Sequence, residues 1–386
     1  MRRTGGLKQW QMERCPPLCS SDTNSLEEKK KLLHQAARKG NVDQVNSMLN
    51  FGIAINCQDN RGWSLLHSAI FFGNQTVVKF LLQKGASVNL RDACNYTPLH
   101  RATWNGYTEL ADYLLQCGAL PDIQNYCGET PLHLAAANGY LPCVKKLLAN
   151  KASINIRDNN MWTPLHWCSI SDHIDVLEYL VSFGVSLEEK SSTGMTLLHL
   201  SALAGNLQVI NFLLNNNVDT NMKEVNGLSA LHLAAENGHC EIVANLLKKG
   251  ALINIADLNK QTPLHRTAGH GYTECVNLLL QEGADVHYTD ILDLTPLHHA
   301  AYKGRNDTTA VLLQHGANIN AKDCLGKTPL HLGVEMGHVD VVKTLKEWGA
   351  DPLVKTKWNE TATAIALQSN RKDLLTIIDI RGMNLC

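Results

Sequence analysis

Apolar and polar residues recur along this chain with a period of 33 residues. The histidines that obey the period are each preceded by leucine: His34, His67, His100, His133, His166, His199, His232, His265, His298 and His331. Thr or Ser stands three residues before nine of them, proline often follows it, and glycine usually stands 6 and 18 residues after the histidine. The next step reaches Ala364 without insertion or deletion, so the pattern predicts eleven repeats.

Each repeat predicts two short helices and a loop. Thr or Ser is a favoured N-cap and Pro suits the first helical position, so a first helix begins just before the histidine. It ends at the glycine, which adopts left-handed backbone easily. The second helix has apolar residues at helical spacing, such as Val77, Val78, Leu81 and Leu82. The polar remainder, such as SVNLRDACNY, predicts a loop or β-hairpin. Because one unit cannot bury its apolar face alone, we expect the units to stack as an all-α solenoid.

Two segments show a family resemblance. TPLHLAAANG (130–139) and TPLHRATWNG (97–106) resemble the helix-turn signature of ankyrin repeats, and the resemblance extends over residues 26–386. It implies an ankyrin-repeat stack of helix-turn-helix units with protruding β-hairpin loops. It also implies a concave groove, formed by hairpins and first helices, that binds a protein without catalysis.

The two ends of the pattern differ from its middle. Repeat 1 begins SLEEKKKLLHQAARKG, and the last repeat carries Ala364 for the histidine and Asn370 for the glycine. Terminal repeats need a polar outer face, so we interpret both as caps. We expect residues 1–25 to form a disordered tail and residues 26–386 the repeat domain. Since the last repeat reaches Gly382, we expect no effector domain after it.

Composition restricts the partners and the compartment. The 386 residues carry 35 Lys and Arg against 36 Asp and Glu, which gives no electrostatic reason to expect nucleic acid. The chain has neither an apolar stretch of about 18 residues nor a secretory signal. We therefore expect no membrane insertion and a monomer in the cytoplasm, with the nucleus as the alternative. Twelve scattered cysteines predict reduced thiols.

The regular histidines have a metal-binding and a structural interpretation. Packed helices lie about 8–10 Å apart, whereas zinc ligands lie about 2 Å from the ion, so neighbouring histidines cannot share one ion. We favour hydrogen bonds to the preceding Thr and the adjacent loop. No phosphate-binding loop or nucleophile motif appears. The prediction is therefore no enzyme, no cofactor and no metal.

Aromatic residues gather in the slots that the resemblance assigns to partner binding, namely the hairpin tips and the exposed face of the first helix. The predicted protein-binding residues are Trp63, Phe71, Phe72, Tyr96, Trp104, Tyr126 and Trp162. Rigid aromatic rings suit binding surfaces because they bury a large area at little entropic cost. The alternative is that some rings, such as Phe71 and Phe72, pack against a neighbouring hairpin or helix.

Later repeats place aliphatic side chains and one tyrosine in the same slots: Met195, Leu203, Leu228, Leu258, Ile291, Leu292, Leu294 and Tyr302. They could extend the same groove or contact another chain. Repeat 5 departs from the pattern at Trp167, Cys168, Ser169 and Asp172, which indicates either a softer joint or drift.

The function expected from these features is a scaffold or adaptor that binds one or more proteins. Two alternatives are an inhibitor that masks one partner and a subunit that recruits substrates to a ubiquitin ligase.

Overall fold

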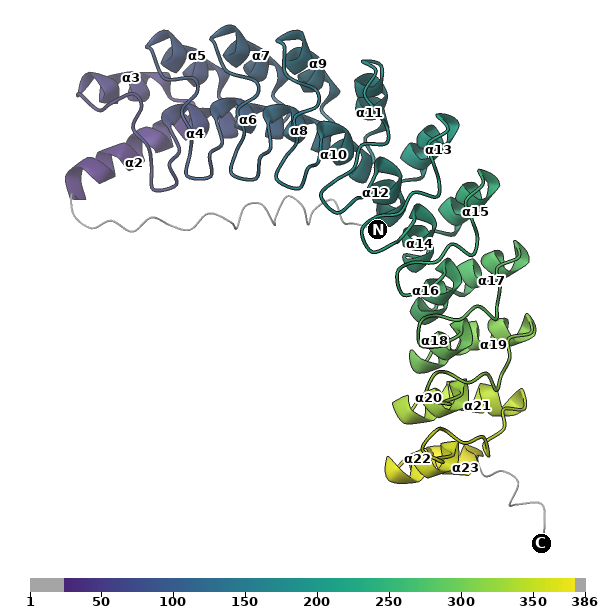
Figure 1. Ribbon diagram of the computed structural model, residues 1–386. Coiled ribbons are helices and arrows are strands. Elements are labelled where there is room, and N and C mark those ends of the chain that lie inside the picture. The colour runs from purple at the N-terminus through teal and green to yellow at the C-terminus, as the bar shows by residue number, and fades with distance from the viewer. Residues whose placement is uncertain (1–23, 379–386) are drawn as a thin grey trace. The chain divides into compact units, whose positions relative to one another are not determined.

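The computed structural model describes residues 24–378, which form eleven helix pairs, as the 33-residue period predicts (Figure 1). The chain divides into two compact units, Met1–Ser192 and Thr193–Cys386, here called unit 1 and unit 2. The helices of unit 1 are α2 (Asn24–Lys39), α3 (Val42–Asn50), α4 (Leu65–Phe71), α5 (Gln75–Gln83), α6 (Pro98–Trp104), α7 (Thr108–Gln116), α8 (Pro131–Ala137), α9 (Leu141–Ala149), α10 (Pro164–Ile170) and α11 (Ile174–Val181).

Unit 2 continues the same alternation of first and second helices. Its helices are α12 (Leu197–Ala204), α13 (Leu207–Asn215), α14 (Ala230–Glu236), α15 (Cys240–Lys248), α16 (Pro263–His270), α17 (Thr273–Gln281), α18 (Pro296–Tyr302), α19 (Asn306–Gln314), α20 (Pro329–Met336), α21 (Val339–Glu347), α22 (Ala362–Gln368) and α23 (Lys372–Ile378). The all-α solenoid prediction is confirmed.

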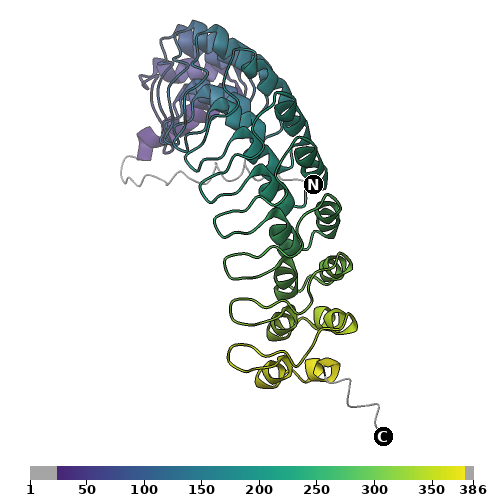
Figure 2. The same cartoon turned by 45° about the vertical axis from the view of Figure 1, so that its right-hand side comes forward.

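Each unit has two helix layers and a row of loops. The first helix of a repeat packs on the first helix of the next repeat and on its own second helix. In unit 1 the loops extend from the first-helix layer, on the side opposite the second helices (Figure 1). Figure 2 shows the loops of unit 2 projecting in a row from its first helices. We call the loops together with the exposed side of the first helices the loop face.

The first helices from α4 to α22 are seven or eight residues long and capped as predicted. In α6, Thr97 accepts a hydrogen bond from the backbone of His100, and Pro98 is the first helical residue. Leu99 and Ala102 are fully buried between neighbouring first helices. The cap satisfies a backbone donor that a seven-residue helix cannot satisfy by itself.

Left-handed backbone ends the helices where the period places glycine. Gly106 has φ 74°, and a Cβ there would lie 2.7 Å from the Tyr140 ring of the next repeat. Asp172 and Lys151 occupy glycine slots and keep the left-handed conformation, with φ 62° and 63°. The geometry is therefore kept even where the favoured residue is missing, which strains these two residues. The boundary between the units follows the repeat that contains Asp172.

The loops are hairpin-like but contain little β-structure. Within residues 24–378, β-pairing amounts to one isolated bridge, Gln58 to Ser64. The loops are closed by backbone hydrogen bonds such as that from Asp92 N–H to the Tyr96 carbonyl, 2.9 Å. Successive tips are joined in the same way, as in Leu258 N–H to the Asn226 carbonyl, 3.1 Å. A ladder of single hydrogen bonds thus aligns the tips within each unit.

Two sequence-based expectations are revised or left aside. The structure joins Cys240 to Cys275 in a disulfide, and Cys94 is disulfide-bonded as well, so the prediction that all cysteines are reduced thiols is wrong for these three. The predicted tail, residues 1–25, lies almost entirely outside the described residues, and α2 begins at Asn24. Among the described helices, none is long and apolar enough to cross a membrane.

Candidate functional site

The regular histidines from His67 to His298 are held on both ring nitrogens, with Nδ1 bonded within the repeat and Nε2 bonded to the next loop. In repeat 3, His100 Nδ1 accepts from Thr97 N–H at 3.1 Å, so the ring proton is on Nε2, which donates to the Glu129 carbonyl at 3.1 Å. Burial lowers the pKa of His100 to about 3 and that of His67 to about 4. These rings are therefore neutral links between one first helix and the next loop.

This arrangement supports the structural interpretation of the histidines. His133 bonds in the same way to the Trp162 carbonyl, and His232 to the Gln261 carbonyl. Within residues 24–378, no cluster of three or more His, Cys, Asp or Glu side chains is placed to hold a metal ion.

A carboxylate at the start of most loops organises the loop face, with Asn125, Ser191 and Thr356 in the same slot of the other three. Asp92 Oδ1 accepts from the backbone N–H groups of Cys94 and Tyr96, both at 2.9 Å, which closes the tip. Its Oδ2 receives Arg101 Nη2 at 2.5 Å, and the Asp92 side chain is almost fully buried. Asp257 and Arg266 repeat this pair in unit 2, at 2.6 Å.

Other donors occupy the arginine slot in two repeats. Trp167 Nε1 donates to Asp158 Oδ2 at 3.0 Å, and His299 Nε2 lies 2.9 Å from Asp290 Oδ2. Burial raises the pKa of Asp290, but hydrogen bonds from His299 and the loop backbone outweigh this and lower it to about 2. The sequence analysis did not single out these pairs. Their signal was present, because an acidic residue often recurs eight residues before the histidine, and a donor follows the histidine in these repeats.

In unit 1 an arginine side chain lies between two aromatic rings. The Arg101 guanidinium lies 4.4 Å from the Tyr96 ring centroid and 4.9 Å from that of Trp63. Cation–π contacts of this kind contribute about 0.5–2 kcal/mol each. Tyr96 Oη also donates to Glu129 Oε2 at 3.4 Å, and burial raises the Tyr96 pKa. The stack joins two successive loops to a first helix.

The predicted aromatic residues differ strongly in exposure. Trp63 is only 8% exposed and its ring lies 5.1 Å from that of Phe71, so the packing alternative holds for Trp63. Phe71 is half-buried and lies 5.3 Å from Phe72, which is 51% exposed. Of these three rings, Phe72 is the one available for contact.

The remaining four rings of the series lie on the loop face of unit 1. Tyr126 is 69% exposed at a loop tip, where its backbone N–H bonds to the Cys94 carbonyl. Tyr96, Trp104 and Trp162 are half-buried. The Trp162 ring lies 5.1 Å from Trp167, in an edge-on arrangement. Phe72 and Tyr126 are thus the most exposed rings of the predicted series, and Tyr96, Trp104 and Trp162 are partly exposed.

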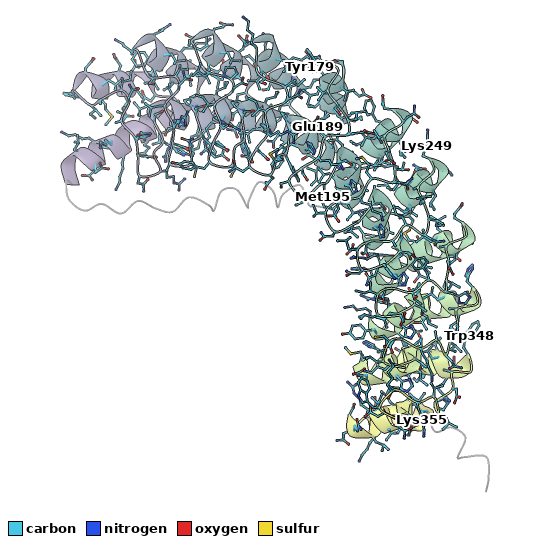
Figure 3. The ribbon with its side chains drawn as sticks, in the orientation of Figure 1. Tyr179, Glu189, Met195, Lys249, Trp348 and Lys355 are labelled. Carbon is cyan, nitrogen blue, oxygen red and sulfur yellow. A yellow bond between two sulfur atoms is a disulfide. The ribbon has the colours of Figure 1, made fainter. Side chains whose placement is uncertain are left out.

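The exposed apolar side chains on the loop face of unit 2 are mostly aliphatic. Leu258, Ile291 and Leu292 are 70%, 54% and 50% exposed at successive tips. Leu203 and Tyr302 are exposed on first helices, whereas Met195, Leu228 and Leu294 are half-buried. Figure 3 labels Met195 on the loop that leads into α12, and Trp348 at the end of second helix α21.

The structure adds three tip residues that the sequence analysis missed. Val225, Leu325 and Trp358 are 59%, 38% and 59% exposed in the tip slots of unit 2. The signal that could have found them is position: they stand six or seven residues before a regular histidine or its substitute Ala364.

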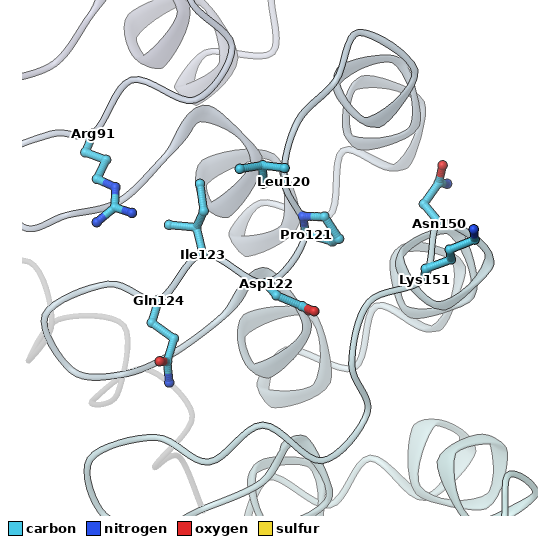
Figure 4. Close-up of a pocket in the computed structure, with 8 residues that line it drawn as sticks. All are labelled: Arg91, Leu120, Pro121, Asp122, Ile123, Gln124, Asn150 and Lys151. Atoms are coloured by element: carbon cyan, nitrogen blue, oxygen red, sulfur yellow. The ribbon is translucent and has the colours of Figure 1, made fainter.

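Unit 1 contains a depression of about 710 Å³ (Figure 4). Its lining residues come from two loops and the end of α9: Arg91, Leu120, Pro121, Asp122, Ile123, Gln124, Asn150 and Lys151. Most of them are exposed and both charge signs are present, so the lining selects no evident ligand. None of the predicted aromatic residues lines it.

Comparison with known families gives a repeated match. The family model described as ankyrin repeats (3 copies) matches residues 17–92, 33–125, 99–191, 198–290 and 264–356. Comparison with curated proteins finds no match. The matched segments together cover most of both units.

Proposed function

Because this chain belongs to the ankyrin-repeat family, whose repeats are protein-interaction modules, we propose that it is a non-enzymatic scaffold or adaptor. In this proposal a partner protein binds the loop face of unit 1, with Phe72 and Tyr126 as its principal anchors. Tyr96, Trp104 and Trp162 extend the contact.

The observation that carries this proposal is the combination of exposure and rigidity at Tyr126. Its side chain is 69% exposed, while its backbone is tied into the ladder of loop tips. An aromatic ring on a fixed backbone loses little entropy when a partner covers it. The Arg101 stack and the closed Asp92 loop hold the neighbouring tip in place.

The test compares the partners captured from cells by the full chain and by two variants. Phe72→Ala combined with Tyr126→Ala removes the two exposed rings of the loop face. Phe51→Ala is the matched control, because Phe51 is 86% exposed but follows the second helix α3. Loss of interface anchors of this kind costs about 2 kcal/mol or more, about thirtyfold in affinity.

We expect the double variant to lose at least one partner, the control to keep it, and both to melt like the wild type. Retention of every partner by the double variant would contradict the proposal, as would equal loss with Phe51→Ala. The same experiment separates the roles: an adaptor captures two proteins at once, an inhibitor suppresses the activity of one, and a ligase subunit co-purifies with ligase components.

A further inference from the structure

The disulfide between Cys240 and Cys275 links two second helices across a repeat boundary. Cys240 begins α15 in repeat 7, Cys275 lies in α17 in repeat 8, and their Cα atoms are 5.1 Å apart. The two cysteines are 35 residues apart in sequence, so they occupy slots that the repeat brings together elsewhere as well.

Two equivalent pairs show what these slots hold without a covalent bond. Thr108 Oγ1 lies 3.3 Å from Cys143 Sγ, and Thr273 Oγ1 lies 3.1 Å from Thr308 Oγ1. Both pairs are also 35 residues apart and join successive second helices. Helix packing alone therefore brings these atoms into contact. The fold therefore accommodates a disulfide in one repeat and a non-covalent pair at the equivalent positions of other repeats.

The two cysteines differ in their exposure to solvent. Cys275 is fully buried, whereas Cys240 is partly exposed at the start of its helix. The side from which a thiolate in solution can approach the bond is therefore that of Cys240. Burial raises the pKa of the Cys143 thiol, which occupies the slot equivalent to Cys275. A leaving thiolate in such a slot is poorly solvated, which slows exchange.

From these observations we propose that Cys240–Cys275 is a reversible thiol–disulfide exchange site, opened from the Cys240 side by a small thiol. The thiolate attacks Cys240 Sγ and forms a mixed disulfide, the Cys240–Cys275 bond breaks, and its electron pair goes to Cys275 Sγ, which takes up a proton. A second thiolate attacks the small-molecule sulfur of the mixed disulfide and releases Cys240. Two small thiols are thereby oxidised to one disulfide and the protein pair is reduced.

The consequence of opening is confined to one repeat boundary. Because each repeat contacts only its neighbours, a covalent link between α15 and α17 strengthens the coupling of repeats 7 and 8. The loops of these repeats carry the exposed tip residues Val225 and Leu258. The oxidised form therefore holds this part of the loop face more firmly than the reduced form. The proposal does not depend on the proposed partner binding.

The test uses the full chain in mixtures of reduced and oxidised glutathione. Alkylation before and after reduction, read by mass spectrometry, gives the oxidation state of Cys240 and Cys275 separately. Hydrogen exchange of α15 and α17 reports the coupling, and that of α7 and α9 is the internal reference. Reduction should make amides in α15 and α17 exchange about thirtyfold faster or more, with α7 and α9 unchanged.

Two variants designed from the equivalent slots complete the test. Cys240→Thr with Cys275→Thr copies the pair Thr273 and Thr308, so it should fold and show no response to glutathione. Thr108→Cys should form a bond to Cys143 and transfer the response to α7 and α9.

Three results would overturn the proposal. The first is free thiols at both positions in oxidising buffer, and the second is equal exchange rates in the oxidised and reduced wild type. The third is global unfolding of unit 2 on reduction, which would make the bond a permanent structural requirement. If the double threonine variant fails to fold, the wild-type titration and Thr108→Cys still decide.

Discussion

Unit 1 and unit 2 are built on the same helix pairs, yet their loops present different chemistry. In unit 1 the tips and first helices carry aromatic rings and polar side chains, with an arginine stacked between Tyr96 and Trp63. In unit 2 the corresponding tips carry exposed aliphatic side chains such as Leu258 and Ile291. Both units bury the same types of residue at the same repeat positions. The difference between them therefore lies in exposed positions, which helix packing does not fix.

This difference separates the positions that stabilise the stack from the positions that are free to contact a partner. The regular histidines and their Thr or Ser partners recur in both units, with Nε2 bonded to the following loop in most repeats. The exposed apolar tip residues Tyr126 and Leu258 instead leave most of their side-chain surface in solvent. A partner that binds unit 1 is therefore expected to differ from one that binds unit 2, although the frames are equivalent.

The largest expected effect is acid unfolding of both units. In the folded chain, burial lowers the pKa values of the regular histidines below the usual 6.5. The unfolded chain therefore binds more protons than the folded chain once the pH falls below that value. Stability should be complete above pH 6.5 and lost as the pH falls towards 4. The values are about 3 for His100 and about 4 for His67, His166, His232, His265 and His298. At pH 5 each of these histidines lowers the free energy of unfolding by about 2 kcal/mol.

Hydrogen exchange between pH 7 and 4.5, resolved by unit, measures this loss. His287→Gln, at an exposed position, is the control and should not change the profile. A stability that stays flat down to pH 5 would contradict the neutral assignment, and loss in one unit alone would mean that the frames are not equivalent.

The second prediction compares the stability that the Arg101–Asp92 and Arg266–Asp257 pairs contribute. Arg101→Ala leaves the Asp92 carboxylate buried without its partner and removes the ring contacts, so we expect a loss of about 3 kcal/mol. Arg266→Ala leaves Asp257 in the same state and loses a 3.4 Å ion pair with the partly exposed Glu236, but it has no aromatic stack to lose. It should cost about 1 kcal/mol less.

Urea unfolding of the full chain measures both losses. Arg61→Ala is the control, because the exposed Arg61 lies 6.0 Å from the Trp63 ring and should contribute less than about 0.5 kcal/mol. Equal losses for Arg101→Ala and Arg266→Ala would mean that the aromatic stack contributes no more than the ion pair of Arg266 with Glu236.

A third prediction concerns partner choice. Leu258→Ala with Ile291→Ala should weaken a partner of unit 2 by about tenfold, because two exposed side chains of intermediate size are removed. The partners lost with Phe72→Ala and Tyr126→Ala should be retained. Quantitative capture with both double variants checks this, and loss of the same partners by both would show that one protein spans both loop faces.

The smallest effect compares two strained helix ends. Lys151 in unit 1 and Asn217 in unit 2 stand in the slot where glycine ends the second helix, with φ 63° and 56°. Lys151→Gly should stabilise unit 1 by about 1 kcal/mol, and Asn217→Gly should stabilise unit 2 by less, since Asn tolerates left-handed backbone. Thermal melting measures both, and a lower melting temperature for Lys151→Gly would contradict the strain.

Much of the fold could be predicted from the sequence because its rules are local and recur eleven times. The N-cap Thr97, the left-handed Gly106 and the apolar spacing of α5 each depend on residues a few positions apart. The hydrogen bond of the regular histidine to Thr has the same local character. Its second bond, to the next loop, follows once the repeats stack.

Contacts between repeats decided the rest. Trp63 and Tyr126 were both predicted to be binding rings, but one lies under Arg101 beside Phe71 and the other faces solvent. The sequence places each ring in a repeat slot without showing which side chain of the next repeat covers it. Cys240 and Cys275 likewise became a pair only when α15 and α17 packed. Spacing along one chain sets the repeat, whereas burial and pairing depend on what the neighbouring repeat presents.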